Sequence, residues 1–191
     1  YAVVNDFQFL HTQPELTRRA GLIEAVKVAL VRDGEFFAWM EKNVEGLRSL
    51  DEATLEEAVE RSAVHHAKHI AQGGDPFELG SSRPLDYGHW AAHKLEQLTD
   101  FELSHGEAVS VGVALDTVYA AKVALLDAKD AERVLKVIEG LELPVWHEAL
   151  ELRDSKGRRC VFNGLEEFRE HLGGELTVLL LKETGVGVDV H

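Results

Sequence analysis

The stretch of residues 108–124 constrains the fold most, because Ala, Val and Leu make up most of it. A helix that is apolar on nearly every side must be buried by other elements. Helical patterns with apolar stripes accompany it over residues 14–30, 36–43, 51–71, 85–98 and 130–140. The sequence therefore predicts a set of helices packed against one buried helix.

Three short runs near the C-terminal end have the composition of strands: residues 159–162, 175–181 and 186–190, the last two joined across Glu183-Thr184-Gly185. No repeat or linker divides the 191 residues, and 45% of them are hydrophobic, enough for one packed domain. We expect a mainly α fold, with one helical domain over residues 1–191 and a small β element near the C-terminus. The Gly-x-Gly-x-x-Gly fingerprint of nucleotide-binding loops does not occur.

Three histidines stand at spacings that suit a metal site. His89 and His93 are four residues apart, so they project from one face of a helix, one turn apart. His105 begins the buried helix and would point back toward them. Two neutral imidazoles and one carboxylate, here a glutamate from an earlier helix, form a common open set of catalytic zinc ligands. The pattern predicts a divalent-metal site beside a general acid or base.

The other histidines have a plainer interpretation. The chain contains ten histidines, and single ones are usually surface residues or satisfied core residues; we assign His11, His147 and His171 to that class. His65, His66 and His69 could mimic a metal cluster, but no carboxylate stands at a ligand-like spacing among them. We therefore interpret these three as the polar face of a helix.

Charge and composition exclude several classes of function. The formal charge of −14 and the lack of a basic stripe argue against a nucleic-acid partner. No apolar run approaches membrane-spanning length and no signal segment is present, so we expect no membrane association. The single Cys160 suits the reducing cytoplasm. An anionic substrate would need local cations, for which the candidates are Lys27, Lys68, Arg83 and Lys94.

In order along the chain, these motifs resemble those of the dehydroquinate synthase-like sugar phosphate cyclases. Residues 20–27, Ala-Gly-Leu-Ile-Glu-Ala-Val-Lys, resemble that family's Ala-Gly-x-Ala-Glu-Val-Ile-Lys helix. Residues 86–93, Asp-Tyr-Gly-His-x3-His, resemble its Asn-Phe-Gly-His-Thr-x-Gly-His, and residues 105–109 match its His-Gly-Glu-Ala-Val. Lys68, Asp75, Glu78 and Gly80 also fall in register with a family stretch. Together the motifs identify the chain as similar to the helical C-terminal domain of this family.

The resemblance implies roles for these residues. Glu24, His89 and His105 would be ligands of Zn²⁺ or another divalent metal such as Co²⁺, and His93 would contact the substrate phosphate and assist proton transfer. Lys27 and Lys68 would be catalytic residues that supply positive charge in the active site, although snorkelling surface lysines are the plain alternative. Glu107 would either support His105 or be a solvated carboxylate at a helix N-terminus.

The family's architecture carries further expectations. NAD would bind an N-terminal Rossmann-like domain. We expect this domain to be absent from the chain, which begins at Tyr1 without an initiator Met; such an isolated domain would bind metal without turnover. The reaction would be NAD-assisted phosphate elimination and aldol cyclisation of a phosphorylated sugar. The full-length form would be a homodimer.

Some positions depart from the family pattern. The Asn before the Gly-His motif is Asp86, and the usual Arg four residues earlier is Ser82, with Arg83 shifted by one; both Asp86 and Arg83 remain candidates for substrate binding. Near the C-terminus, residues 168–171 read Phe-Arg-Glu-His where the family has Asp-Lys-Lys. These departures favour a sugar phosphate other than the dehydroquinate synthase substrate, such as one of the valiolone type, while Lys68 favours the opposite.

Two other functions fit the same residues. A metal-dependent polyol or alcohol dehydrogenase shares the architecture and would transfer hydride without phosphate elimination. The pairing of Glu24 with Lys27, and Lys68 in register, favour the cyclase, because a neutral alcohol needs no such cations. A non-catalytic metal-binding relative is the other alternative, and the substitutions at the substrate positions support it.

Overall fold

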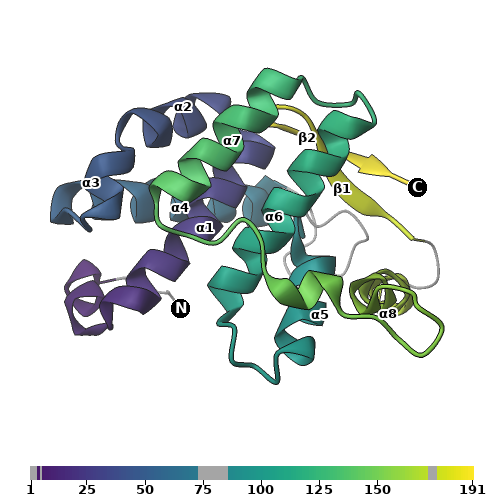
Figure 1. The fold of residues 1–191 in the computed structure, drawn as a ribbon. Coiled ribbons are helices and arrows are strands. Elements are labelled where there is room, and N and C mark those ends of the chain that lie inside the picture. The colour runs from purple at the N-terminus through teal and green to yellow at the C-terminus, as the bar shows by residue number, and fades with distance from the viewer. Residues whose placement is uncertain (1–3, 5, 73–85, 172–175) are drawn as a thin grey trace.

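The computed structural model describes residues 4, 6–72, 86–171 and 176–191. Its elements in chain order are η1 (Phe7–Thr12), α1 (Glu15–Arg32), α2 (Gly34–Lys42), α3 (Val44–Arg48), α4 (Glu52–Gln72), α5 (His89–Leu98), α6 (His105–Lys122), α7 (Ala128–Gly140), η2 (Glu148–Glu151), η3 (Cys160–Phe162), α8 (Asn163–His171), β1 (Val178–Glu183) and β2 (Val186–Val190). Figure 1 shows helices throughout, with a two-stranded antiparallel hairpin at the C-terminal end. The predicted fold class, mainly α with a small β element, is confirmed.

Helix α6 is the buried helix that the apolar run predicts. It packs against α1, α5, α7 and β1 (Figure 1). Its side chains are buried almost continuously from Ala108 to Thr117, whereas Val118 and Tyr119 are exposed. Its buried hydroxyl groups have internal partners: Ser110 donates to the Pro144 carbonyl at 2.7 Å, and Thr117 donates to the Val113 carbonyl at 2.7 Å. Because these polar groups are paired, the buried part of this helix is compatible with a dry interior.

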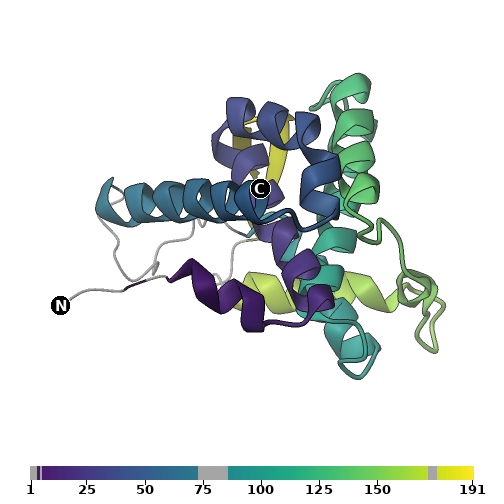
Figure 2. The ribbon, with the colours of Figure 1, turned by 90° about the vertical axis from the view of Figure 1, so that its left-hand side faces the viewer.

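Helix α1 is the second central element. It contacts α2, α4, α6 and the hairpin, and Ile23, Val26 and Leu30 on it have no exposed surface. Burial of each such side chain stabilises the fold by roughly 1.5–3 kcal/mol. Figure 2 shows α4 as the long helix that extends to one side of the molecule. None of the described helices combines the length and apolarity needed to cross a membrane.

The predicted strand at residues 159–162 is wrong. Arg159 forms a single isolated bridge with Arg153, and residues 160–162 then form η3. The cause is a tight turn, in which the Asp154 carboxylate accepts hydrogen bonds from the backbone N–H groups of Lys156 and Arg158. The two arms of this turn are too short for a ladder.

Other element boundaries also differ from the prediction. The helix expected from residue 85 begins at His89, and the strand expected from residue 175, which lies outside the described residues, begins at Val178. The short helices α3 and α8 were not expected from the sequence.

Candidate metal centre

Close backbone approaches at glycines bring three helices together around the histidines. A Cβ at Gly106, in the first turn of α6, would lie 2.4 Å from the Ala20 carbonyl oxygen on α1. A Cβ at Gly112 would lie 2.0 Å from the Gly88 carbonyl oxygen, and Gly88 itself has a φ of +79°. No other residue type fits such approaches without displacing a helix. The glycines beside His89 and His105 therefore determine how closely α1, α5 and α6 approach.

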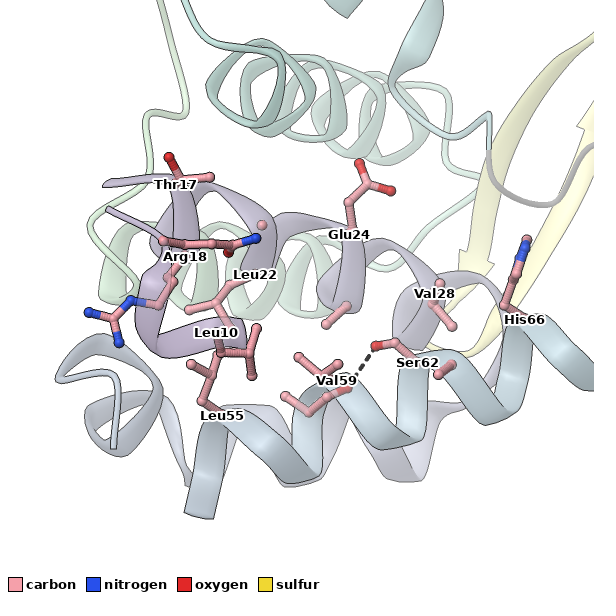
Figure 3. A pocket seen from close by; sticks show the side chains of 15 residues that line it. Leu10, Thr17, Arg18, Leu22, Glu24, Val28, Leu55, Val59, Ser62 and His66 are labelled. Atoms are coloured by element: carbon pink, nitrogen blue, oxygen red, sulfur yellow. Dashed lines mark hydrogen bonds between the residues drawn. The ribbon is translucent and has the colours of Figure 1, made fainter. Parts of the chain in front are cut away.

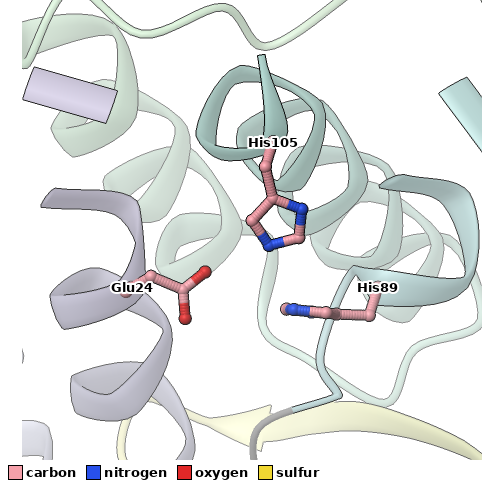
Figure 4. Close-up of side chains that lie close together, drawn as sticks. All are labelled: Glu24, His89 and His105. Carbon is pink, nitrogen blue, oxygen red and sulfur yellow. The ribbon is translucent and has the colours of Figure 1, made fainter. Parts of the chain in front are cut away.

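Glu24, His89 and His105 converge at this junction, one from each helix. Their ligand atoms, one from each side chain, all lie within 4.8 Å of one another. Figure 4 shows the Glu24 carboxylate and the two imidazoles directed toward a common space. The three residues that the family resemblance implies as ligands are thus neighbours in the folded chain.

Hydrogen bonds orient both imidazoles in the same sense. The Nδ1 atom of His89 lies 3.3 Å from the Tyr87 carbonyl oxygen, and the Nδ1 atom of His105 lies 3.3 Å from Oε2 of Glu96. Each acceptor favours a proton on Nδ1, which leaves the lone pair on Nε2. In zinc sites the ligating histidine commonly makes such a contact through its other ring nitrogen.

Lys27 provides the positive charge of the cluster. Its side chain is 2% exposed, and its Nζ lies 2.6 Å from Oε2 of Glu24 and 3.4 Å from Nε2 of His89. Burial, together with the nearby Lys27 ammonium, lowers the pKa of His89 to about 4. His89 is therefore neutral at pH 7, as a metal-ligating imidazole must be.

The cluster satisfies a test of fit for a divalent metal. The Oε1 atom of Glu24 is buried and has no hydrogen-bond partner among the residues that the structure describes. An unsatisfied buried carboxylate oxygen costs about 1–3 kcal/mol or more, and a bound cation would remove that cost. Two imidazoles and one carboxylate also form a ligand set that suits zinc and leaves a position for substrate.

His93 lies beside the cluster, exposed to solvent. Its ring meets that of His89 edge-on, with centroids 5.5 Å apart, and stacks on that of His105 at 6.1 Å. His93, Glu96 and His105 make a second group whose ligand atoms lie within 4.8 Å of one another. Glu96 was missed by the sequence interpretation, although its position three residues after His93 places it on the same face of α5.

Asp116 is a second residue that the sequence interpretation missed. It is buried on α6, where one oxygen accepts the Gly88 N–H at 3.0 Å and the other accepts the Trp90 Nε1–H at 2.9 Å. Burial raises its pKa to about 7, against the opposing effect of the two hydrogen bonds. Because these bonds hold both neighbours of His89, Asp116 fixes the start of α5. A lone acidic residue in an otherwise apolar run was the available signal.

Among the residues that the structure describes, the other predicted site residues lie outside the cluster of Glu24, His89 and His105. Lys68 is exposed on α4, and no hydrogen bond or ion pair of the described residues joins it to the cluster. Asp86 is half-buried just before α5, and its carbonyl accepts the His89 N–H at 2.9 Å. Arg83 lies outside the described residues. Glu107 forms a capping box with Ser104 at the start of α6, which supports the helix-terminus alternative for that carboxylate.

A separate cavity of about 430 Å³ lies between η1, α1 and α4. Leu22, Leu55 and Val59 are among its apolar lining residues, and Arg18 and His66 are among the polar ones. Glu24 also lines this cavity, and Figure 3 shows its carboxylate directed away from α4.

Comparison with known proteins supports the motifs read from the sequence. Residues 21–157 match the family model described as 3-dehydroquinate synthase C-terminal. The 3-dehydroquinate synthase of Acinetobacter baumannii (strain SDF) is 33% identical over 187 residues, covering 97% of this chain and 50% of that enzyme. That of Halorhodospira halophila is 33% identical over 188 residues, covering 98% and 51%. The chain spans about half the length of the curated relatives it matches.

Solved structures show the same similarity. The 2-epi-5-epi-valiolone synthase ValA from Streptomyces hygroscopicus subsp. jinggangensis 5008, with NAD⁺ and Zn²⁺ bound, is similar with a TM-score of 0.83 and 28% identity. The match covers 97% of this chain and 50% of that one. A 2-deoxy-scyllo-inosose synthase complexed with carbaglucose-6-phosphate, NAD⁺ and Co²⁺ has a TM-score of 0.68, covering 96% and 49%. At 19% identity, this second likeness shows the fold alone.

Proposed function

Because the chain belongs to the 3-dehydroquinate synthase C-terminal family, we propose that it is the metal- and substrate-binding half of a sugar phosphate cyclase. The observation that carries this proposal is the convergence of Glu24, His89 and His105 around a buried carboxylate oxygen without a partner among the described residues. The reaction would be phosphate elimination and cyclisation of a phosphorylated sugar, with NAD held by a separate domain.

Each residue of the site would have its own role. Glu24, His89 and His105 would hold Zn²⁺ or Co²⁺, which when bound would polarise and acidify substrate hydroxyl groups. Lys27, which is itself buried, holds the Glu24 carboxylate in place through an ion pair. His93, exposed at the edge of the cluster, would exchange a proton with a substrate oxygen.

The substrate contacts are the finer part of the proposal. We assign Asp86 and Arg83 to them and keep Lys68 as a catalytic cation, as the sequence indicates. The net charge of −14 repels an anionic substrate, so cations near the site must offset that field locally. Asp86 adds negative charge next to the histidine helix, which favours a substrate whose hydroxyl groups face this position over one with a carboxylate there.

The first experiment is a zinc titration of the 191-residue chain beside its Glu24→Ala and His105→Ala variants. One tight equivalent in the wild type, lost in both variants, is the expected result. The matched control is His11→Ala, since His11 is an exposed histidine that contacts only Glu52 among the described ion pairs and lies on η1, away from the cluster. Equal zinc binding by all four proteins would overturn the metal site.

The activity itself requires the chain joined to an NAD-binding domain. We expect consumption of a sugar phosphate with release of inorganic phosphate and no net NADH. Accumulation of NADH without inorganic phosphate would instead identify a dehydrogenase. Inertness toward all sugar phosphates tried, in a protein that binds both metal and NAD, would identify a non-catalytic relative.

A further inference from the structure

Glu96 makes a contact that the proposed metal site does not yet account for. Its Oε2 lies 3.3 Å from Nδ1 of His105, which comes from the next helix. The Glu96 side chain is 16% exposed, whereas that of His105 is 50% exposed. A half-exposed imidazole at the first position of a helix can rotate about its side-chain bonds unless another group holds it. Glu96 is the better anchored partner of the pair.

The opposite edge of the same ring faces the proposed ligands. Figure 4 shows one ring nitrogen of His105 directed at the space between Glu24 and His89. When Nδ1–H donates to Glu96, the nitrogen that faces this space is Nε2 and carries the lone pair. His89 has the matching arrangement, with the Tyr87 carbonyl in the place of Glu96.

We propose that Glu96 is a positioning residue that fixes the rotamer and tautomer of His105, so that its Nε2 is presented to the metal. This inference rests on the metal site of the proposed function. Groups that hold a ligating histidine in this way typically contribute 10- to 100-fold in metal affinity. We expect Glu96→Ala to weaken zinc binding by about that factor without changing the stoichiometry. Glu96→Gln, whose amide oxygen still accepts from Nδ1–H, should lie between the two.

A different role for Glu96 would be direct ligation, because His93, Glu96 and His105 also form a possible donor group. The two donor groups share His105, and one ion on each would require both ring nitrogens of that imidazole as ligands. Such a bridge would need the ring to lose its remaining proton, which is costly for histidine. Only one of the two sets can therefore hold an ion at a time, and we place it on the set containing Glu24 and His89, because the buried Oε1 of Glu24 has no hydrogen-bond partner among the described residues.

The test measures zinc affinity by competition with a chromophoric chelator, and the visible spectrum of the Co²⁺ form, for Glu96→Ala and Glu96→Gln. Glu102→Gln is the control, because it removes an equal charge from an exposed glutamate three residues before His105. Thermal unfolding of the metal-free variants separates positioning from a general loss of structure. Unchanged affinity in Glu96→Ala would overturn the inference. Retained binding in Glu24→Ala and His89→Ala, with loss in His93→Ala, would place the ion on the other set and also overturn it.

A readout that needs no metal keeps this inference distinct from the proposed function. Side-chain ¹⁵N shifts of His105, recorded at about pH 8.5 where imidazoles are neutral, report which ring nitrogen is protonated. We expect the Nδ1–H tautomer in the wild type and a shift toward Nε2–H in Glu96→Ala. If the wild type bound no zinc but Glu96→Ala still changed the tautomer of His105 in this way, the proposed function would fail and the role of Glu96 would stand. The Nε2–H tautomer in the wild type would refute the role of Glu96 alone.

Discussion

The junction between α1 and α6 allows a sharp test of how the fold builds the site, through Gly106→Ala. The added Cβ would lie 2.4 Å from the Ala20 carbonyl oxygen and 2.8 Å from the Ala20 Cβ, so the helices must separate. Overpacking of this kind typically costs about 1–3 kcal/mol. For a chain of this length we expect the melting temperature to fall by between about 2 and 12 °C. Because His105 precedes Gly106, zinc affinity should fall as well.

Gly21→Ala is the matched control. Gly21 lies on α1 one residue from Ala20, and nothing lies within 4 Å of a Cβ placed there. The substitution should stabilise the protein by about 0.5–1 kcal/mol, since Ala favours the helix over Gly. Thermal unfolding of both variants without metal, followed by zinc titration, checks the pair. If Gly106→Ala unfolded like Gly21→Ala and bound zinc like the wild type, the close-approach argument would be refuted.

Three further predictions concern the same junction. His93→Ala should leave zinc affinity nearly unchanged while His105→Ala loses the metal, and equal losses in a zinc titration would show that His93 is a ligand. Asp116 has a folded pKa of about 7, above its unfolded value, so its stabilising contribution is full below about pH 4 and is lost as the pH rises through about 7. The advantage of the wild type over Asp116→Asn in chemical unfolding should therefore shrink as the pH rises from about 5 to about 7, and change little above about pH 8. The titration of His89 is common to both proteins and cancels in this difference. A constant advantage between about pH 5 and about pH 7 would contradict the raised pKa. Zinc at about 100 times its dissociation constant should raise the free energy of unfolding by about 2.7 kcal/mol, and a melting temperature independent of zinc would contradict binding to the folded state.

The sequence predicts the helices well wherever apolar residues recur at helical spacing along the chain. The stretch that forms α6 is apolar on nearly every side and is buried over most of its length, and α1 follows its apolar stripe. Residues 159–162 show the limit of this reasoning. Their composition suits a strand, but strand formation depends on a partner, and the turn built by Asp154 directs the chain into η3.

The candidate site was predictable in its residue types but not in its supporting contacts. The spacing of His89 and His93 places both on one face of a helix, whereas the proximity of Glu24 to His105 depends on a close approach at Gly106 that no local pattern reveals. Asp116 and Glu96 act across helices, so their roles follow from packing alone. His65 is a similar case, since its partner Asp33 is 32 positions away in the sequence and lies 2.8 Å from it.

The arrangement also indicates why metal binding and folding are separable in this chain. The helices that carry Glu24, His89 and His105 are held together by apolar residues such as Ile23, Leu95 and Val109, which have no exposed surface. In small zinc domains the metal itself supplies the folding free energy. Here the ligands stand on helices that already pack on a core, so the metal-free chain should keep its fold. The unpartnered Oε1 of Glu24 would then be a local cost of a preformed site, offset when a cation binds.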